Sequence, residues 1–252
     1  MRVALVINAV TCNQKDNLSA IMSMTQKAAD GGADLILFPE AALTGLINND
    51  DPTHDLPLGE SLPGPVTDAL ARLCSDNNVW LGIGLLERDH QCLFDTAVLL
   101  DSKGSIAIKY RRIQPQWHGV HANPLIYKEG TVIPTVVSPF GTLGFLICGD
   151  LFDDEIISEF KKLHADWLLF PFARSFNDGS FDQDRWDTEE LPVYADRVKR
   201  SNTTALMVNL LADPELHDGN SFGGAWVISS QGEVIASYPL GKSGILWVDF
   251  QI

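Results

Sequence analysis

The stretch VWLGIGLLERDHQCLFDTAVLLDSKGSIAIKYRR, residues 79–112, decides the fold class of this chain. It contains three predominantly apolar segments, at 79–87, 93–101 and 105–112. Segments of this length and composition, separated by polar and glycine residues, are typical of successive β-strands. A tight turn at 102–104 joins the last two segments, so these two strands are predicted to be antiparallel neighbours.

The sequence on both sides of this stretch alternates strand and helix patterns. Short apolar runs at 2–9 and 34–40 predict buried strands, and apolar residues at helical spacing between Leu18 and Ala29 predict a connecting helix. Further helix, strand and hairpin patterns follow in the second half of the chain. No internal repeat and no low-complexity linker interrupts them. Residues 1–252 are therefore predicted to form a single α/β domain with mixed strand directions.

The overall charge excludes several classes of partner. The chain has 18 Lys and Arg residues against 33 Asp and Glu residues, which gives a net charge of −15. Such a field repels the phosphates of nucleic acids and the headgroups of anionic membranes. No uninterrupted apolar run approaches the roughly 18 residues that a membrane-spanning helix needs. The sequence thus predicts neither a nucleic-acid partner nor a membrane partner.

The cysteines are too few and too scattered for a disulfide scaffold, and no two of them form a Cys-x-x-Cys pair. They are Cys12, Cys74, Cys92 and Cys148. Free thiols are typical of a reducing compartment. The apolar run at 2–9 is interrupted by Asn8, and no cleavage pattern of small residues follows, which indicates a strand instead of a signal peptide. We therefore expect a cytoplasmic protein.

Glu40 and Cys148 each follow directly on a predicted buried strand. Open α/β sheets bind their ligands at the ends of strands. A carboxylate at the end of an apolar run is either a member of an ion pair or a working acid or base. By position alone, Glu40 is better explained as a surface acid at a strand end, and Cys148 as a small buried apolar residue.

The sequence around these two residues favours catalytic chemistry. Glu40 stands in FPEAALTG (38–45), Cys148 stands in GFLICGDLFDDEI (144–156), and KYRRI (109–113) ends a hairpin strand between them. Taken in this order, the segments resemble the nitrilase superfamily of carbon–nitrogen hydrolases. The resemblance continues through DWLLFP and FGGAWVISSQGEVIA, and so extends over nearly the whole chain.

This resemblance implies a four-layer αββα sandwich of mixed sheets that acts on a small-molecule amide or nitrile without a cofactor or metal. It implies a Glu, Lys, Cys catalytic set, in which Glu40 is the general base and Cys148 is the nucleophile that forms an acyl thioester. It also makes the backbone N–H of Gly149 a second donor to the oxyanion. Relatives of this fold pair through an apolar face, so we expect a homo-oligomer.

The chain departs from the superfamily pattern at the lysine. Aligning KYRRI with the family's YRK strand puts Arg112 at the lysine position, while Lys109 falls on the opposite face of the strand. Arg112 keeps the positive charge that stabilises an oxyanion, but it cannot release a proton at working pH. Arg112 is therefore expected to be the oxyanion cation, with no role as a proton donor.

Two further departures concern the substrate side of the site. Asn123 stands where the family usually has a second glutamate, so it is expected to belong with Arg112 to one rearranged polar network that meets the substrate. The alternative is that Asn123 is a turn residue before Pro124. After the nucleophile, Phe152 and Asp153 stand where an arginine and a proline are common in the family.

Other candidates carry weaker signals. Arg174 is expected near the rim of the pocket, where it would hold a substrate carboxylate, although a surface ion pair is the commoner role of such a residue. His118 and His121 have a spacing that suits a metal, but no further ligand completes the set, which favours a solvated loop. The acidic run 178–190 is interpreted as a solvated face or the start of a helix.

Two functions from different classes fit these observations. The first is a hydrolase that cleaves a non-peptide carbon–nitrogen bond, the amide of a small molecule, through an acyl-enzyme on Cys148. The alternative is a catalytically silent member of the fold that binds a small amide or carboxylate, or serves as a scaffold, because two of the four expected polar site residues are replaced. Glu40 and Cys148 both remain and the cation is kept as Arg112, which favours the enzyme.

Overall fold

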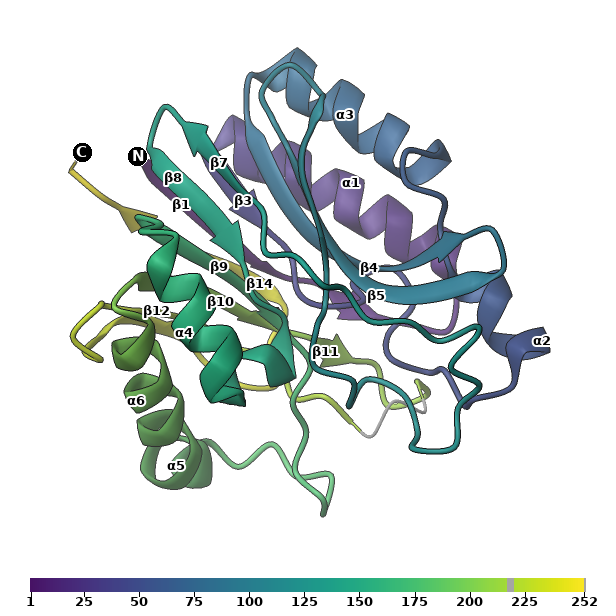
Figure 1. Ribbon diagram of the computed structural model, residues 1–252. Coiled ribbons are helices and arrows are strands. Elements are labelled where there is room, and N and C mark those ends of the chain that lie inside the picture. The colour runs from purple at the N-terminus through teal and green to yellow at the C-terminus, as the bar shows by residue number, and fades with distance from the viewer. Residues whose placement is uncertain (217–219, 252) are drawn as a thin grey trace.

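The computed structural model describes residues 1–216 and 220–251, and its frame is a pair of six-stranded sheets (Figure 1). The strand order is β14-β1-β3-β4-β5-β6 in the first sheet and β13-β12-β10-β9-β8-β7 in the second. The strands of the first sheet are β1 (Arg2–Ile7), β3 (Leu35–Leu37), β4 (Trp80–Asp89), β5 (Cys92–Leu100), β6 (Ile106–Arg111) and β14 (Gly244–Asp249). Those of the second are β7 (Thr135–Ser138), β8 (Gly141–Phe145), β9 (Trp167–Phe172), β10 (Thr204–Asn209), β12 (Ala225–Ile228) and β13 (Val234–Tyr238). A small parallel pair, β2 (Ala9–Val10) and β11 (Leu211–Ala212), completes the strands.

Both sheets are mixed. The central strands β1, β3 and β4 run parallel to one another, as do β8, β9 and β10. The outer strands join by antiparallel pairing, including β4 with β5 and β5 with β6. The antiparallel strands predicted from residues 79–112 are therefore confirmed.

Four helices of two or more turns cover the outer faces of the sheets (Figure 1). They are α1 (Gln14–Asp30), α3 (Pro65–Asn77), α4 (Asp154–Lys162) and α6 (Leu191–Ser201). Helices α1 and α3 lie together on the first sheet, whereas α4 and α6 lie together on the second. The remaining short helices are α2 (Pro52–Asp55), η1 (Leu56–Leu58), η2 (Cys148–Phe152), α5 (Gln183–Arg185) and η3 (Trp186–Glu190). Within the described residues, no helix is long and apolar enough to cross a membrane.

The alternation of side chains along each strand builds two separate core layers. In β1, Ala4 and Val6 pack with α1 and α3, whereas Val3, Leu5 and Ile7 point the other way, into the layer between the two sheets. The central layer also contains large aromatic side chains of the second sheet and of the segments that cover it. Two helical layers outside two packed sheets make a four-layer αββα sandwich, which confirms the fold class implied by the resemblance.

The fold brings the ends of three strands to one place. Glu40 follows β3, Arg112 follows β6 and Cys148 follows β8, and each lies within three residues of the end of its strand. Arg112 begins beside β5, because its backbone N–H donates to the carbonyl of Asp95 at 2.8 Å. Strands of both sheets therefore deliver chemically active side chains to the same edge of the sandwich.

Candidate active site

Glu40 is fully buried, so the interpretation as a surface acid at a strand end is wrong. The chain turns sharply there, with Ala41 at a positive φ of 45°. The turn lies directly on Gly84 of β4, whose N–H donates to the carbonyl of Pro39 at 3.0 Å. A Cβ atom at Gly84 would lie 2.5 Å from the Cα of Glu40, so glycine is required for this close approach.

Arg112 is the nearest charged partner of Glu40. Its guanidinium Nη1 donates to Glu40 Oε1 at 3.0 Å and to Asp95 Oδ2 at 3.4 Å, and its Nη2 donates to Gln114 Oε1 at 3.0 Å. The Arg112 side chain is only 3% exposed. Neighbouring Lys109 donates instead to Glu87 Oε1 at 2.8 Å, on the other face of β6, as strand alternation predicts. The cation beside Glu40 is thus Arg112.

Cys148 occupies a sharp turn at the start of η2. Its φ of 44° lies in the left-handed region, which a residue other than glycine adopts at a cost of about 1–3 kcal/mol and which is concentrated at functional sites. The half-buried side chain places Sγ 3.8 Å from the carbonyl oxygen of Ala173. Cys148 lies close enough to Glu40 and Arg112 to raise the pKa of both side chains when it is a thiolate.

The turn that carries Cys148 is tied to the segment after Arg112 by Asp150. This buried carboxylate accepts hydrogen bonds from the N–H groups of Ile147, Ile113 and Gln114 and from the hydroxyl of Tyr110. One side chain therefore fixes the position of the nucleophile turn relative to the arginine. The sequence reasoning missed Asp150, although an acid two residues after the cysteine in ICGD was visible.

Asp95 is the second residue that the sequence reasoning missed. It lies on β5, is 1% exposed and sits in the otherwise apolar run LFDTAVLL. Its Oδ2 accepts from the same Arg112 nitrogen that donates to Glu40. A single acid within a buried strand was the signal that could have identified it, because such an acid needs a cationic or hydrogen-bonding partner.

The electrostatics of the site make Glu40 a strong proton acceptor. Burial raises the pKa of Glu40 well above its usual value, the negative charges of Cys148 and Asp95 add to this rise, and Arg112 opposes it. Burial also raises the pKa of Asp95, against the hydrogen bonds and charge that lower it. Burial would lower the pKa of Arg112, but the surrounding negative groups hold it above its usual range, so Arg112 stays charged.

Gly149 lies against the guanidinium of Arg112. A Cβ atom there would lie 2.5 Å from Arg112 Nη2 and 2.6 Å from Gln114 Oε1. Glycine therefore lets the nucleophile turn approach the cation. A larger residue at this position would push the Cys148 turn and Arg112 apart.

Arg174 lies on the other side of Cys148, following β9. Its guanidinium donates to Glu190 Oε1 at 2.8 Å, and the negative charge of Cys148 contributes to raising its pKa. Buried Tyr194 is also near, since the charges of Cys148 and Arg174 both affect its pKa. The acidic run 178–190 was interpreted as solvated, but its last residue, Glu190, is an ion-pair partner at the edge of the site.

Asn123 lies apart from these groups. It is exposed, and its Oδ1 accepts the N–H of Leu125 at 3.0 Å within a turn. The described partners of the Arg112 guanidinium are Glu40, Asp95 and Gln114, so the structure does not join Asn123 to the arginine in one network. The turn interpretation of Asn123 fits its observed position.

The two histidines of the neighbouring loop also have ordinary partners. His118 Nε2 lies 2.8 Å from Glu129 Oε1, and His121 is exposed. Among residues 1–216 and 220–251, no group of three or more His, Cys, Asp or Glu side chains could hold a metal ion.

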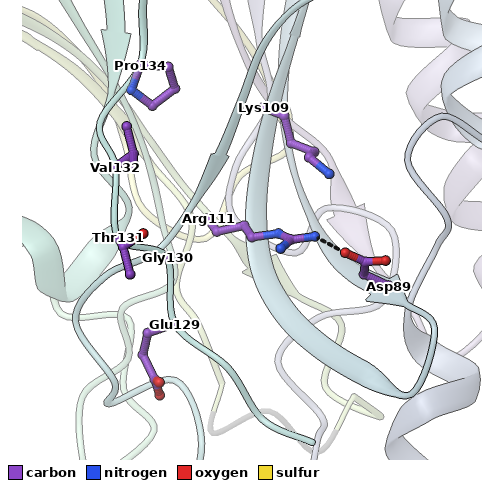
Figure 2. Close-up of a pocket in the computed structure, with 8 residues that line it drawn as sticks. All are labelled: Asp89, Lys109, Arg111, Glu129, Gly130, Thr131, Val132 and Pro134. Carbon is purple, nitrogen blue, oxygen red and sulfur yellow. Dashed lines mark hydrogen bonds and ion pairs between the residues drawn. The ribbon is translucent and has the colours of Figure 1, made fainter.

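A separate charged hollow lies on the other face of β6 (Figure 2). Asp89, Lys109, Arg111 and Glu129 are among its lining residues, and Arg111 points across it toward Asp89. Arg111 Nη2 donates to Asp89 Oδ2 at 2.7 Å. This hollow is thus distinct from the place where Glu40, Arg112 and Cys148 meet.

Comparison with known proteins relates this arrangement to enzymes. The family model described as carbon-nitrogen hydrolase matches residues 2–252. A deaminated glutathione amidase from Dictyostelium discoideum is 25% identical over 264 aligned residues, which cover 100% of this chain and 88% of that protein.

Solved structures share the fold at lower sequence identity. A carbon-nitrogen hydrolase from Helicobacter pylori G27 has a TM-score of 0.82 at 19% identity, covering 98% of this chain and 88% of that one. An amidase from Nesterenkonia sp. AN1 has a TM-score of 0.79 at 21% identity, covering 100% of this chain and 93% of that one.

Proposed function

This chain belongs to the carbon–nitrogen hydrolase family, and we propose that it hydrolyses the amide bond of a small molecule through an acyl-enzyme on Cys148. The observation that carries this proposal is the meeting of three groups at the strand ends. Glu40 is a buried base with a raised pKa, Arg112 is a buried cation 3.0 Å from it, and Cys148 is held in a strained turn beside both. The amidase activity of the Dictyostelium discoideum relative agrees with this reaction class.

In the first half-reaction, Glu40 takes the proton of the Cys148 thiol as the sulfur attacks the carbonyl carbon of the amide. The S–H bond breaks, the S–C bond forms, and the carbonyl electrons move to the oxygen. Arg112 and the N–H of Gly149 stabilise this oxyanion. The C–N bond then breaks, and the proton on Glu40 goes to the leaving nitrogen, so that ammonia or an amine departs.

In the second half-reaction, water cleaves the thioester. Glu40 takes a proton from the water as its oxygen attacks the acyl carbon. The C–S bond breaks, the carboxylic acid leaves, and the proton returns to the sulfur of Cys148. Because Arg112 keeps its charge throughout, Glu40 carries every proton in this scheme.

The substrate we propose is a small amide that bears a carboxylate. Arg174 lies beside Cys148 and carries the positive charge that would hold such a group. Its present partner is Glu190, and both side chains are partly exposed, at 37% and 25%. A substrate carboxylate would therefore compete with Glu190 for the exposed side of the guanidinium.

The experiment is mass spectrometry of the protein incubated with a panel of short amides and nitriles, some with a carboxylate. We expect an acyl adduct on Cys148 and release of the acid. Cys148→Ala should form no adduct and lose turnover by at least about 10³-fold. Cys92→Ala is the matched control, because Cys92 is another half-buried free thiol remote from Glu40 in the fold.

Two results would overturn the proposal. Equal turnover by the Cys148→Ala variant would remove the acyl-enzyme mechanism. Absence of turnover, together with alkylation of Cys148 by iodoacetamide only after denaturation, would indicate the catalytically silent binding protein. Burial raises the pKa of Cys74 to about 12, so this thiol provides an internal standard for an unreactive cysteine in the same digest.

A further inference from the structure

The buried carboxyl groups of this protein differ in how completely they are hydrogen-bonded. Asp55, Glu87 and Asp150 each accept hydrogen bonds at both carboxylate oxygens. Glu40 and Asp95 are different: within the described part of the chain, Glu40 Oε2 and Asp95 Oδ1 are buried and have no donor. Leaving a buried charged oxygen without a donor is costly.

These two incompletely bonded groups are neighbours. Both accept from the same nitrogen, Arg112 Nη1, at 3.0 Å for Glu40 and 3.4 Å for Asp95. Both side chains are buried, so a single guanidinium faces two carboxyl groups with almost no water to screen them. Two ionised carboxylates here would leave one negative charge uncompensated in the core.

We propose that Glu40 and Asp95 share one proton, held between Glu40 Oε2 and Asp95 Oδ1, and that Asp95 is a positioning residue for the base. The shared proton supplies the missing donor to both orphaned oxygens. It also leaves one carboxylate for one guanidinium, so the three side chains are neutral together. Like charges this close do not both ionise.

The groups that face the pair are consistent with a retained proton. Burial, followed by the charges of Cys148 and Asp95, raises the pKa of Glu40 against the effect of Arg112. Burial also raises the pKa of Asp95. Tyr194 faces the pair from α6, and its raised pKa keeps its hydroxyl neutral. Arg112 is therefore the cation that offsets the pair.

Asp150 and Tyr110 lie on the far side of Arg112 and are hydrogen-bonded to each other. Asp150 accepts four donors and so keeps its own charge without drawing on the shared proton. The acid that competes with Glu40 for Arg112 Nη1 is thus Asp95.

The shared proton gives Asp95 a role in the proposed reaction, on which this part of the inference rests. With the proton on Asp95, Glu40 is ionised and accepts the proton of Cys148: the S–H bond breaks and an O–H bond forms on Glu40. Asp95 stays neutral during this step. The Glu40 proton then passes to the leaving nitrogen, and no other reactant is required.

Infrared spectroscopy tests the shared proton without any turnover. A protonated carboxyl group gives a C=O band that an ionised one lacks. We expect the native protein at pH 7 to show such a band, and both Glu40→Gln and Asp95→Asn to lose it. In each variant, the remaining carboxyl group has Arg112 to itself and an amide N–H donor beside it, so it ionises. Asp89→Asn, on β4, is the matched control and should keep the band.

The pH dependence of the band gives a second readout. In the native protein it should disappear only above the ordinary carboxyl range of about 4. A band that survives in Glu40→Gln would show that Asp95 holds a proton of its own, and an absent band in the native protein would show that none is shared; either result overturns the inference. A lack of amidase activity with the band intact would instead count against the proposed function alone. If Asp95→Asn does not fold, Glu40→Gln still decides.

Discussion

Arg111 and Arg112 are consecutive residues that serve opposite faces of one sheet edge. Arg111 points into the surface hollow and binds Glu87 and Asp89, and its side chain is 24% exposed (Figure 2). Arg112 points into the protein and binds Glu40 and is 3% exposed. Each arginine therefore contacts a buried glutamate, yet the surroundings of the two glutamates differ.

The difference lies in the number of hydrogen-bond donors. Burial alone would raise the pKa of Glu87, but hydrogen bonds from Arg111, Lys109 and Thr96 bring it below its usual value. Glu40 has one donor group, a competing carboxyl and a nearby thiol, so its pKa is raised. A fully satisfied carboxylate stabilises the fold, whereas an incompletely satisfied one retains the affinity for protons that a general base needs.

The largest expected effect separates the two arginines. Arg112→Met removes the only cation bonded to Glu40 and, under the proposed mechanism, the oxyanion donor, so turnover should fall by about 10³-fold. Arg111→Met should leave turnover within about twofold, because Arg111 touches none of the reacting groups. Steady-state kinetics of the two variants, with circular dichroism to verify folding, measures this contrast. Equal losses in both variants would mean that the face of the sheet does not matter.

The two glutamates should respond oppositely to neutralisation. Glu87→Gln should lower the free energy of unfolding at pH 7 by about 1–3 kcal/mol, because it removes the acceptor of two cations. Glu40→Gln should raise it by up to about 1 kcal/mol, because a buried strained acid is removed from a functional site. Urea unfolding of both variants and the native protein gives these values.

The pH dependence follows from the direction of each shift. Glu87 has a lowered folded pKa, so its contribution is present above its unfolded value of about 4.3 and is lost as the pH falls through the folded pKa. Glu40 has a raised folded pKa, so its contribution is present at low pH and is lost as the pH rises toward that pKa. Both differences from the native protein should therefore shrink near pH 4. Parallel curves at all pH values would contradict this assignment.

Sequence patterns were sufficient for the strands and for the three strand-end residues. Hydrophobic periodicity predicted the hairpins at 79–112, and the ordered segments around Glu40, Arg112 and Cys148 indicated the family, which the comparisons confirm. These features are local in the sequence, since each depends on a strand and on the residue that ends it.

The missed residues depend on partners that are far away in the sequence. Asp95 matters because β5 places it beside Arg112, 17 residues later. The same holds for Asp150, which holds N–H groups of a segment 36 residues earlier. Asn123 illustrates the converse: its position in a motif suggested a site residue, but its side chain closes a local turn. Pairing across the fold, and not residue type, separates these cases.

A more conservative change should still distinguish the two arginines, with a smaller effect. Arg112→Lys keeps the charge but cannot bond Glu40, Asp95 and Gln114 together, as the planar guanidinium does. We expect turnover to change by about tenfold or more, against less than about twofold for Arg111→Lys. The measurement is kcat/KM for both variants on the same amide. An unchanged Arg112→Lys variant would remove the fork geometry from the mechanism.

The smallest expected effect lies at the outer end of the surface cluster. Asp89 is 46% exposed and bonds Arg111 at 2.7 Å, while Arg111 keeps two further bonds to Glu87. Water and salt screen an exposed pair of this kind, so Asp89→Asn should lower the free energy of unfolding by less than about 1 kcal/mol. Turnover should be unchanged, and the stability difference should shrink further in high salt. Because the same substitution at Asp95 alters the buried pair, a comparable effect of Asp89→Asn on catalysis would show that net charge, instead of position beside Glu40, governs the site.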